Sequence, residues 1–321
     1  MTKAPIDALI SGYVSMDRII EVDSPLRAGY TSLVTNRDNA TIHYGGCSIN
    51  IAYGLARLGL KTMPCIRVGA DYADIGLERF LVEGGVSTDA VTIVAEEMTS
   101  NCYLIEDAEH EHVTVYYPGA MGGRYAVPLD PELFTGARLG VITVGSAPDN
   151  REFLRRCQDQ NVPVAFGMKG DFSAFPEEFL REVLAYSSVI FLNRAESAAI
   201  QDRLGLASIT ELFTSDRVQY VVVTSGSQGS ACYERSPAGV ELTRVPIVAG
   251  GKVVDTTGSG DAYIAGFLYG YLGGLAGMTC GQLGACLASF VVEARGCCTA
   301  MPNKDEFWQR YTHHFGEVSP L

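Results

Sequence analysis

The chain has 321 residues, enough for one large α/β domain or two modest ones, and either can bury a substantial core. Its formal net charge of −13 argues against a surface that coats nucleic acid, because such surfaces need clustered Lys and Arg. A local site must therefore hold any anionic ligand.

Cysteine usage and hydropathy limit the other protein classes. Nine cysteines are present, but none belongs to a Cys-x-x-Cys pair that is matched by a second pair or a histidine cluster, so no structural zinc site is predicted. The odd count, without a signal peptide, favours reduced thiols, and Cys297-Cys298 is interpreted as structural. Because no apolar run approaches a membrane span, we expect a soluble, cytoplasmic protein without membrane or nucleic-acid partners.

The first half of the chain predicts one buried strand and a set of more polar ones. Residues 8–11 are apolar and typical of a core strand, whereas 19–22, 33–34 and 41–44 are shorter and less apolar. Two alternating segments, 101–105 and 112–117, predict a β-hairpin. We expect a small β-sheet lid, formed from about 17–44 and 99–119, which could close over a substrate or pair with a second subunit as a homodimer.

A helix is predicted to begin just after Gly45 and Gly46, with Asn50 in its first turn. The glycines allow a substrate to rest against bare backbone, and the Asn amide can both donate to and accept from a hydroxyl. A strand-to-helix turn with a capping Asn explains the same residues, and the local pattern alone favours it.

From residue 139 onward strands and helices alternate. Strands are predicted at 140–144, 163–166, 189–192 and 220–224, and helices at about 150–160, 176–186, 194–204, 279–294 and 303–313. Near-continuous apolar strands of this kind are typical of a parallel sheet covered by helices on both faces. Ligands of such sheets bind beyond the carboxyl ends of the strands.

Polar residues follow two of these strands. Asn193 and Glu196 begin a helix and can face one ligand, with the carboxylate holding water on Mg²⁺, although a capping box explains them equally well. Thr224-Ser225-Gly226 and Gly229 follow the next strand and could equally form a hairpin turn.

The most informative stretch runs from Asp255 to Gly270. A strand is predicted at 245–248, and a helix follows, with Gly258 and Gly260 bracketing Ser259 at its start. N–H groups at a helix start lack intrahelical partners and lie at the positive end of the dipole, so they suit phosphate oxygens or an oxyanion. Asp261, in the first turn, suits proton transfer from an alcohol. The pattern indicates phosphoryl transfer, although a turn with a capping Asp also fits.

No Gly-x-x-x-x-Gly-Lys-[Ser/Thr] sequence occurs, and no Gly-x-Gly-x-x-Gly follows a strand, so P-loop and Rossmann proteins are not indicated. Instead, the order of four elements resembles the ribokinase, or PfkB, family of carbohydrate and nucleoside kinases over essentially the whole chain. These elements are Gly45-Gly46…Asn50, Asn193…Glu196, Thr224…Gly226 and Asp255…Asp261. Tyr44–Cys47 and Val115–Met121 look most like prokaryotic adenosine-kinase-like members.

The resemblance implies one ribokinase-like α/β kinase domain over residues 1–321, with a doubly wound, mostly parallel central sheet flanked by helices and a small β lid. It also implies transfer of the γ-phosphoryl group of ATP, with Mg²⁺, to a primary hydroxyl. Asp261 matches the family's catalytic base, and the N–H groups of Gly258, Ser259 and Gly260 match its anion hole. Asp17, with Gly45, Gly46 and Asn50, matches the residues that hold substrate hydroxyls.

The remaining matches concern nucleotide and cations. Asn193 and Glu196 resemble the motif that positions Mg²⁺ and phosphates, and ATP is expected at Thr224, Ser225, Gly226 and Gly229 with Gly258 and Gly260. Asp255 and Thr257, with backbone near Gly296 and Ala300, match positions where several members hold a monovalent cation such as K⁺.

Two departures and three tyrosines bear on the acceptor. Cys47 stands where ribokinases often have Lys, which speaks against a ribokinase-type site, and Ser259 replaces a commoner Ala. Tyr103, Tyr116 and Tyr117 could stack on a base, with Tyr117 the substrate-binding candidate, or could belong to the lid core. The expected acceptor is a nucleoside such as adenosine.

Two alternatives stay open. The acceptor could be a sugar such as ribose, fructose or a ketodeoxy sugar acid. The chain could also be a non-catalytic regulatory protein on the same fold. The motif has Asp261 and both glycines, Gly258 and Gly260, and their presence argues against the regulatory alternative.

Overall fold

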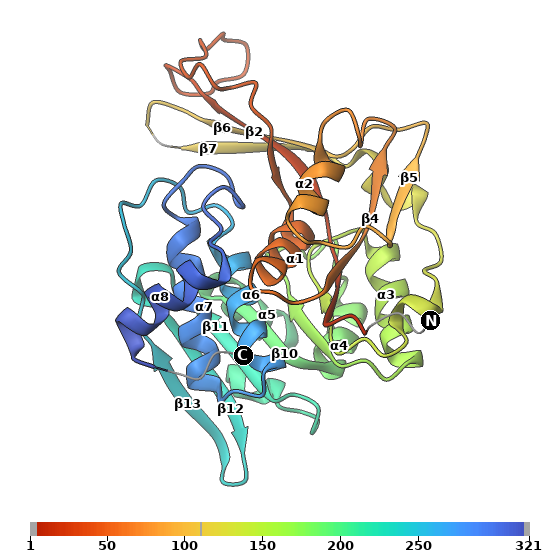
Figure 1. Cartoon of the computed structure of the whole chain (residues 1–321), viewed down its shortest axis with the longest axis vertical. Coiled ribbons are helices and arrows are strands. Elements are labelled where there is room, and N and C mark those ends of the chain that lie inside the picture. Colours follow the sequence, from red (N-terminus) through yellow and green to blue (C-terminus); the bar gives the residue numbers. More distant parts are fainter. Residues whose placement is uncertain (1–4, 110, 318–321) are drawn as a thin grey trace.

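A computed structural model describes residues 5–109 and 111–317. Its centre is a nine-stranded sheet with helices on both faces, and a smaller four-stranded sheet projects from one end of the molecule (Figure 1). Across the central sheet the strands are β13 (Gly239–Val245), β12 (Ser230–Ser236), β11 (Tyr220–Thr224), β10 (Ser187–Asn193), β9 (Val164–Gly167), β8 (Gly140–Ile142), β1 (Ala8–Ser11), β4 (Thr62–Gly69) and β5 (Val91–Val94).

The seven strands from β11 to β5 are parallel, and β12 and β13 are added antiparallel at one edge. Strand order reverses at the β1–β8 pair, because the chain runs outward through β4 and β5 on one side and through β9, β10 and β11 on the other. The predicted doubly wound, mostly parallel sheet is therefore confirmed. The reversal point is where open α/β sheets bind their ligands.

Helices close both faces of the sheet. They are α1 (Cys47–Arg57), α2 (Leu77–Glu83), α3 (Ala147–Asp159), α4 (Glu177–Tyr186), α5 (Arg194–Leu204), α6 (Ser259–Leu272), α7 (Gly277–Val291) and α8 (Lys304–Phe315). One apolar cluster lies on the side of α1, α6 and α7, and a second lies on the side of α3, α4 and α5. Each sheet face thus has its own core.

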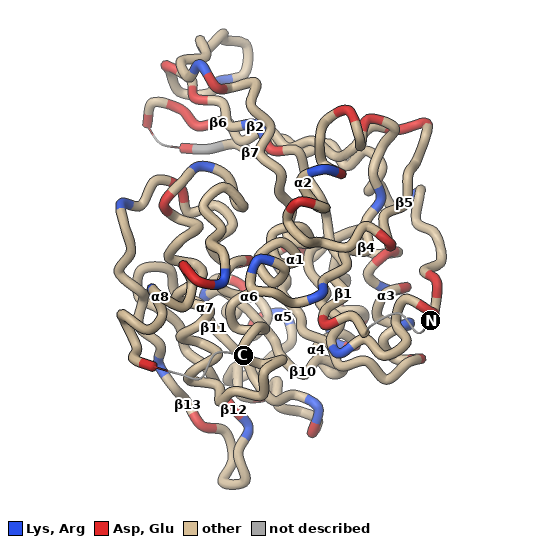
Figure 2. Tube along the Cα trace, viewed as in Figure 1, with Lys and Arg blue, Asp and Glu red and all other residues tan. Residues whose placement is uncertain are grey.

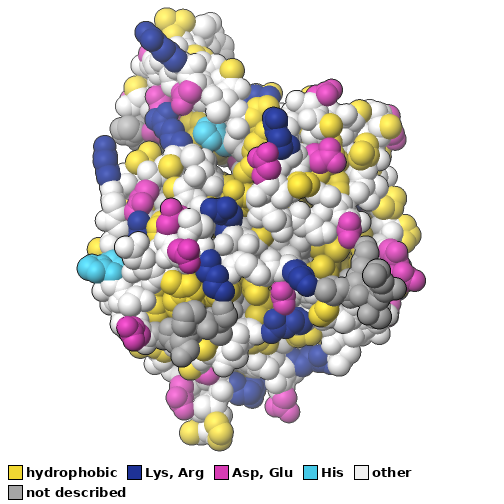
Figure 3. Space-filling model, viewed as in Figure 1, with side chains coloured by type: hydrophobic (Ala, Val, Ile, Leu, Met, Phe, Trp, Pro, Cys, Tyr) yellow, Lys and Arg dark blue, Asp and Glu magenta, His cyan; other side chains and the backbone are white. Residues whose placement is uncertain are grey.

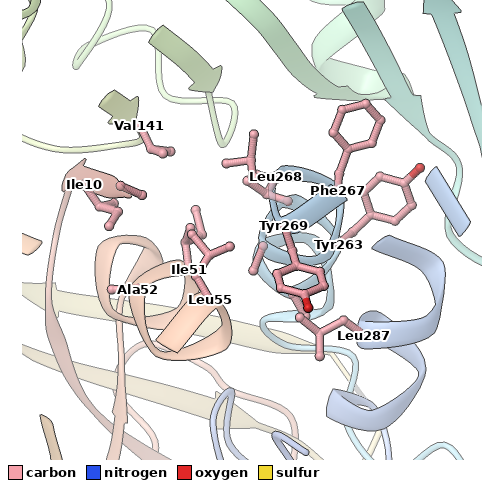
Figure 4. Close-up of a cluster of buried hydrophobic side chains, with 14 of the residues drawn as sticks. Ile10, Ile51, Ala52, Leu55, Val141, Tyr263, Phe267, Leu268, Tyr269 and Leu287 are labelled. Carbon is pink, nitrogen blue, oxygen red and sulfur yellow. The ribbon is translucent and has the colours of Figure 1, made fainter. Parts of the chain in front are cut away.

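Helix α6 is the central helix of the first cluster. Residues 261–270 are all buried, as expected for a helix that is apolar all round. Figure 4 shows Tyr269 of α6 between the side chains of α1 and Leu287 of α7, whereas Phe267 points away from α1 and packs against Phe191 of β10. At Gly266 a side chain would collide with the Leu283 carbonyl, so this glycine permits the close α6–α7 approach. The N-terminus of α6 is consequently held rigidly.

The smaller sheet contains β3 (His43–Gly45), β2 (Ser15–Glu21), β6 (Asn101–Glu106) and β7 (His112–Tyr117), in that spatial order. We call it the lid sheet. Strands β6 and β7 form the predicted antiparallel hairpin, and β2 pairs with β6 in parallel. The two predicted regions of irregular strands therefore form one sheet.

Three local predictions were wrong or incomplete. The strand predicted at 245–248 ends at Val245, because Pro246 has no N–H to donate to a ladder. The antiparallel β12–β13 hairpin was not predicted. The expected strand at 33–34 is reduced to a single bridge between Val22 and Val34.

Charges of both signs are distributed along the chain, including the tip of the lid sheet (Figure 2). The face shown in Figure 3 likewise has acidic and basic side chains interspersed. In the part of the chain that is described, no helix combines the length and apolar character needed to cross a bilayer.

Candidate active site

Asp261 lies in the first turn of α6 and is 2% exposed. Its Oδ2 accepts a hydrogen bond from Asn50 Nδ2 at 2.8 Å. Its Oδ1 is buried and pairs with the Lys169 ammonium, whose Nζ lies 3.0 Å away. Asn50 thus fixes one carboxylate oxygen, and the other can accept a proton from a ligand once the Lys169 ammonium moves away.

The turn before Asp261 exposes backbone N–H groups. Gly258 caps α6 with a φ of 79°, and a Cβ there would lie 2.6 Å from Cys297 Cβ, so only glycine fits. Among the described residues, the N–H groups of Gly258 and Gly260 donate to no turn, cap or side-chain acceptor. The Ser259 N–H donates to the Thr256 carbonyl at 3.2 Å and is already used within the turn. The anion hole predicted from three N–H groups therefore has two available donors.

Asp17 lies on β2 and faces the same region. A Cβ on Gly45 would lie 2.5 Å from Asp17 Oδ2, so the carboxylate rests directly on bare backbone. Gly46 has a φ of 89°, and any side chain there would collide with the Tyr13 carbonyl. The structure therefore brings Asp17, Gly45, Gly46 and Asn50 together as predicted. A side chain at either glycine would collide with a neighbouring atom, which explains why glycine occupies both positions.

The carboxyl of Asp17 is strongly perturbed. Burial raises the pKa of Asp17 to about 6; the Ser15 hydroxyl, which donates to it, opposes the rise, and the negative charge of Asp261 adds to it. Asp17 is 7% exposed. When ionised, a buried carboxylate of this kind can accept hydrogen bonds from hydroxyl groups.

The structure does not bring Tyr117 to this group. Across the lid sheet Asp17 pairs with Cys102, and Cys102 pairs with Tyr116, so these three residues share one face. Tyr117 points to the other face, is 42% exposed and donates its hydroxyl to Glu97 Oε2 at 2.8 Å. The predicted substrate-binding residue therefore lies on the opposite face of β7 from Asp17, because successive residues of a strand point to opposite faces.

Tyr116 is instead the tyrosine beside Asp17. Its ring lies 5.2 Å from that of Tyr13, centroid to centroid. Its hydroxyl is buried and, among the described residues, has no hydrogen-bond partner. Tyr103 lies on the outer face, where Arg18 covers its ring. An aromatic pair with an unpaired hydroxyl suits a ligand that has both a ring and polar groups.

Lys169 was missed by the sequence interpretation. Its Nζ lies 3.0 Å from Asp261 Oδ1, and the side chain is 35% exposed. Lys169 lies just after the carboxyl end of β9. Ligands of parallel sheets bind at the carboxyl ends of the strands, so this rule points to Lys169 as it points to the residues after β10 and β11. No motif surrounds it, and that rule was the one available signal.

Asn193 and Glu196 form a complete capping box at the start of α5. The Asn193 side chain accepts from the Glu196 N–H, and Glu196 Oε2 accepts from the Asn193 N–H at 2.8 Å. Burial raises the pKa of Glu196, and a Cβ on Gly170 would lie 3.9 Å from Glu196 Oε1. Oε1 thus points toward the loop that carries Lys169. A single carboxylate, with waters and ligand phosphates, is a common arrangement for Mg²⁺.

Residues 224–229 form the turn between β11 and β12. The Ser225 N–H donates to the Gly229 carbonyl at 2.8 Å, and Thr224 Oγ1 to the Leu192 carbonyl at 3.4 Å. A Cβ on Gly229 would collide with the Val245 carbonyl, and Gly226 has a φ of 53°. These residues therefore form the hairpin turn that was the alternative interpretation. The turn lies at the same edge of the sheet as Asn193, because Thr224 pairs with Asn193 at the ends of β11 and β10.

The residues predicted to hold a monovalent cation lie in two loops, which are joined by a hydrogen bond between Gly296 and Asp255. Asp255 Oδ1 accepts from the Thr257 N–H at 2.8 Å, and Oδ2 accepts from the Gly296 N–H at 3.3 Å. Ala300 follows in the second loop. Within the described residues there is no cluster of three or more His, Cys, Asp or Glu side chains suited to a metal ion.

Three cysteines surround the buried carboxylates. Cys298 Sγ lies 3.5 Å from Asn50 Oδ1, and Cys297 packs against Gly258. Burial, followed by the charge of Asp261 or Asp17, raises the pKa values of Cys47, Cys297 and Cys298. Neutral, buried thiols are unreactive, which agrees with a structural role for the Cys297-Cys298 pair.

Comparison with known proteins extends these observations to the whole chain. The pfkB family carbohydrate kinase model matches residues 6–304. A nucleoside kinase of Methanocaldococcus jannaschii is 29% identical over 303 residues, covering 94% of this chain and 96% of that protein. The solved structure of the nucleoside kinase from that organism has a TM-score of 0.84 at 27% identity, covering 97% of this chain and 100% of the other.

A nucleoside kinase of Burkholderia thailandensis, solved in complex with inosine, has a TM-score of 0.83 at 25% identity, covering 97% of this chain and 99% of the other. It has also been solved in complex with ADP-inosine. The family model covers nearly all of the chain, and the fold and motif order agree with it. The chain therefore belongs to the pfkB family of carbohydrate kinases.

Proposed function

We propose that the protein is an ATP- and Mg²⁺-dependent kinase that phosphorylates the primary hydroxyl of a nucleoside such as adenosine. The observation that carries this proposal is the position of Asp261. It is buried at the start of α6, Asn50 holds one oxygen, the other faces the mobile Lys169 side chain, and the free N–H groups of Gly258 and Gly260 lie in the same turn. A base beside an anion hole is the arrangement that phosphoryl transfer to an alcohol requires.

In this mechanism Asp17 accepts hydrogen bonds from the acceptor's hydroxyls, and Gly45 lets the acceptor approach the backbone. Asp261 Oδ1 takes the proton of the primary hydroxyl as its oxygen attacks the γ-phosphorus. The N–H groups of Gly258 and Gly260 stabilise the negative charge on the transferred group. Glu196, oriented by Asn193, would hold Mg²⁺ through water, and the ion would neutralise phosphate charge when bound.

A nucleoside acceptor is favoured over a sugar for two reasons. The Tyr13–Tyr116 pair offers aromatic surface next to Asp17, and the Tyr116 hydroxyl is buried without a partner in the described structure. A planar, aromatic base can stack face to face on such a surface. The similar nucleoside kinases support the same choice. A sugar such as ribose, fructose or a ketodeoxy sugar acid is the alternative acceptor.

The direct test measures ADP release from ATP and Mg²⁺ with a panel of nucleosides and sugars. We expect turnover with adenosine, inosine or another nucleoside, and a loss of about 10²- to 10⁴-fold in kcat for Asp261→Asn with little change in nucleoside binding. Turnover with a single sugar alone would move the protein to the carbohydrate branch. Normal turnover by Asp261→Asn would refute the assigned base.

Two further features belong to this proposal. The outer face of the lid sheet exposes Tyr103, Val113, Val115 and Tyr117, which are 37–51% exposed, and we expect a second copy to cover it in a homodimer. Sedimentation of the wild type and of Val115→Glu tests the homodimer, and a monomeric wild type would exclude it.

Turnover in K⁺ compared with turnover in tetramethylammonium tests the proposed monovalent-cation site near Asp255.

A further inference from the structure

Lys169 occupies a position that the proposed mechanism leaves unexplained. It is one of two non-glycine residues with positive φ in the described chain, with φ 56°, so its backbone is held in an unfavourable conformation. Gly170 follows with φ 66°. This loop directs the Lys169 side chain to Asp261, where Nζ lies 3.0 Å from Oδ1. Strained backbone of this kind occurs where a side chain must be aimed.

Two groups lie next to the ammonium, and a third lies against the residue that follows Lys169. Besides Asp261, the ammonium lies over the anion-hole turn, because a Cβ on Gly260 would be 3.6 Å from Nζ. Gly170, the next residue, lies against Glu196 Oε1, and the charge of Lys169 acts on the pKa of Glu196 by lowering it. Lys169 is therefore between the base, the anion hole and the candidate Mg²⁺ carboxylate. A transferred phosphoryl group must occupy the same space.

The observed ion pair is incompatible with Asp261 acting as base. Asn50 already occupies Oδ2, so Oδ1 is the oxygen available for the acceptor's proton, and Lys169 covers it. The neighbouring Cys47 thiol is neutral, because burial and then Asp261 raise its pKa. Among the described residues, Lys169 is the one cationic side chain paired with Asp261. It has a flexible four-carbon stem and is 35% exposed, so it can move.

We propose that Lys169 is a catalytic residue that transfers its ionic contact from Asp261 to the γ-phosphoryl group when ATP binds. This inference rests on the proposed kinase function. In the step itself, the acceptor oxygen forms a bond to the γ-phosphorus, and its proton passes to Asp261 Oδ1. The bond between the γ-phosphorus and the β–γ bridging oxygen breaks, and ADP leaves with that electron pair. The ammonium neutralises charge on the transferred oxygens and leaves Oδ1 free for the proton.

The test compares Lys169→Met, Lys169→Arg and a matched control, Lys61→Met. Lys61 is an exposed lysine before β4, at the amino end of the sheet and away from the site. We expect kcat to fall by about 10²-fold or more in Lys169→Met, with nucleoside KM changed less than about threefold. Lys169→Arg should recover part of the loss because it keeps the charge, and Lys61→Met should match the wild type.

Nucleotide binding supplies a second measurement without turnover. If Lys169 contacts the γ-phosphoryl group, Lys169→Met should weaken AMP-PNP binding about tenfold and leave ADP binding within about twofold. Equal effects on both nucleotides, or kcat within threefold of the wild type, would overturn the proposal. Recovery of Lys169→Met activity at high pH would also overturn it, because the lysine would then act only by keeping Asp261 ionised. A wild type without turnover on any acceptor would instead refute the kinase function itself.

Discussion

The side-chain amide of Asn50 donates to Asp261 Oδ2 at 2.8 Å, joining residues that are 211 positions apart. Cys298 Sγ lies 3.5 Å from the Asn50 carbonyl oxygen, which fixes the amide with its nitrogen toward Asp261. The contact connects the first turns of α1 and α6, the two helices that begin at paired glycines. Through it the proposed base is tied to Asn50, one of the residues proposed to bind the acceptor.

Replacing Asn50 with Ala should impair catalysis more than binding. Asp261 would lose its fixed orientation and retain a buried oxygen without a donor, so we expect kcat to fall by about 10- to 100-fold. The free energy of unfolding should fall by about 1–3 kcal/mol, the usual cost of an unsatisfied buried polar group. Steady-state kinetics and denaturant titration measure the two effects. A variant with wild-type kcat would show that the hydrogen bond has no role in orienting the base.

Gly45→Ala should raise the nucleoside KM by about tenfold or more. The new methyl group would lie 2.5 Å from Asp17 Oδ2 and must displace the carboxylate. Gly123→Ala is the matched control, because its Cβ would meet its nearest neighbour, Pro148, at an ordinary 3.5 Å. Equal KM values for the two variants would contradict the placement of the acceptor against Gly45.

Asp17 should make stability depend on pH. Its folded pKa of about 6 lies above the unfolded value near 3.9, so the native state binds the proton more tightly between these values. The stability of the ligand-free protein should therefore fall as pH rises from about 4 to 6, by roughly 3 kcal/mol relative to Asp17→Asn. Urea titrations of both proteins across this range measure it, and a constant difference would contradict the raised pKa.

Nucleoside affinity should show the opposite trend. The ionised Asp17 carboxylate is the stronger acceptor for hydroxyl groups, so KM should rise as pH falls below about 6. Asp17→Asn, which cannot ionise, should bind more weakly at neutral pH and lose this dependence. A wild-type KM that is flat between pH 5 and 7 would separate Asp17 from the acceptor.

The two adjacent tyrosines of β7 should differ sharply. Tyr116→Ala removes aromatic surface beside Asp17 and should raise the nucleoside KM by about tenfold, whereas Tyr117→Ala removes an exposed contact to Glu97 and should change it less than about twofold. Both variants are measured with the same nucleoside. The reverse order of effects would restore Tyr117 as the substrate-binding residue.

Much of the fold followed from local sequence. Strong apolar runs and glycines at helix starts predicted the parallel strands and the start of α6, because these features act within a few residues. The end of β13 at Val245 was predictable from Pro246, whose missing N–H was not taken into account. The β12–β13 hairpin escaped because one of its strands is largely exposed and shows little apolar alternation.

Part of the candidate site was likewise predictable from local sequence, and part was not. By itself the sequence determined the motif from Asp255 to Asp261 and the glycines that precede Asn50, since a turn and its helix are set by neighbouring residues. Only the tertiary structure decided that Tyr116 rather than Tyr117 faces Asp17, and that Lys169 reaches Asp261. Strand register and sheet order depend on packing between segments far apart in the chain, and no local pattern encodes them.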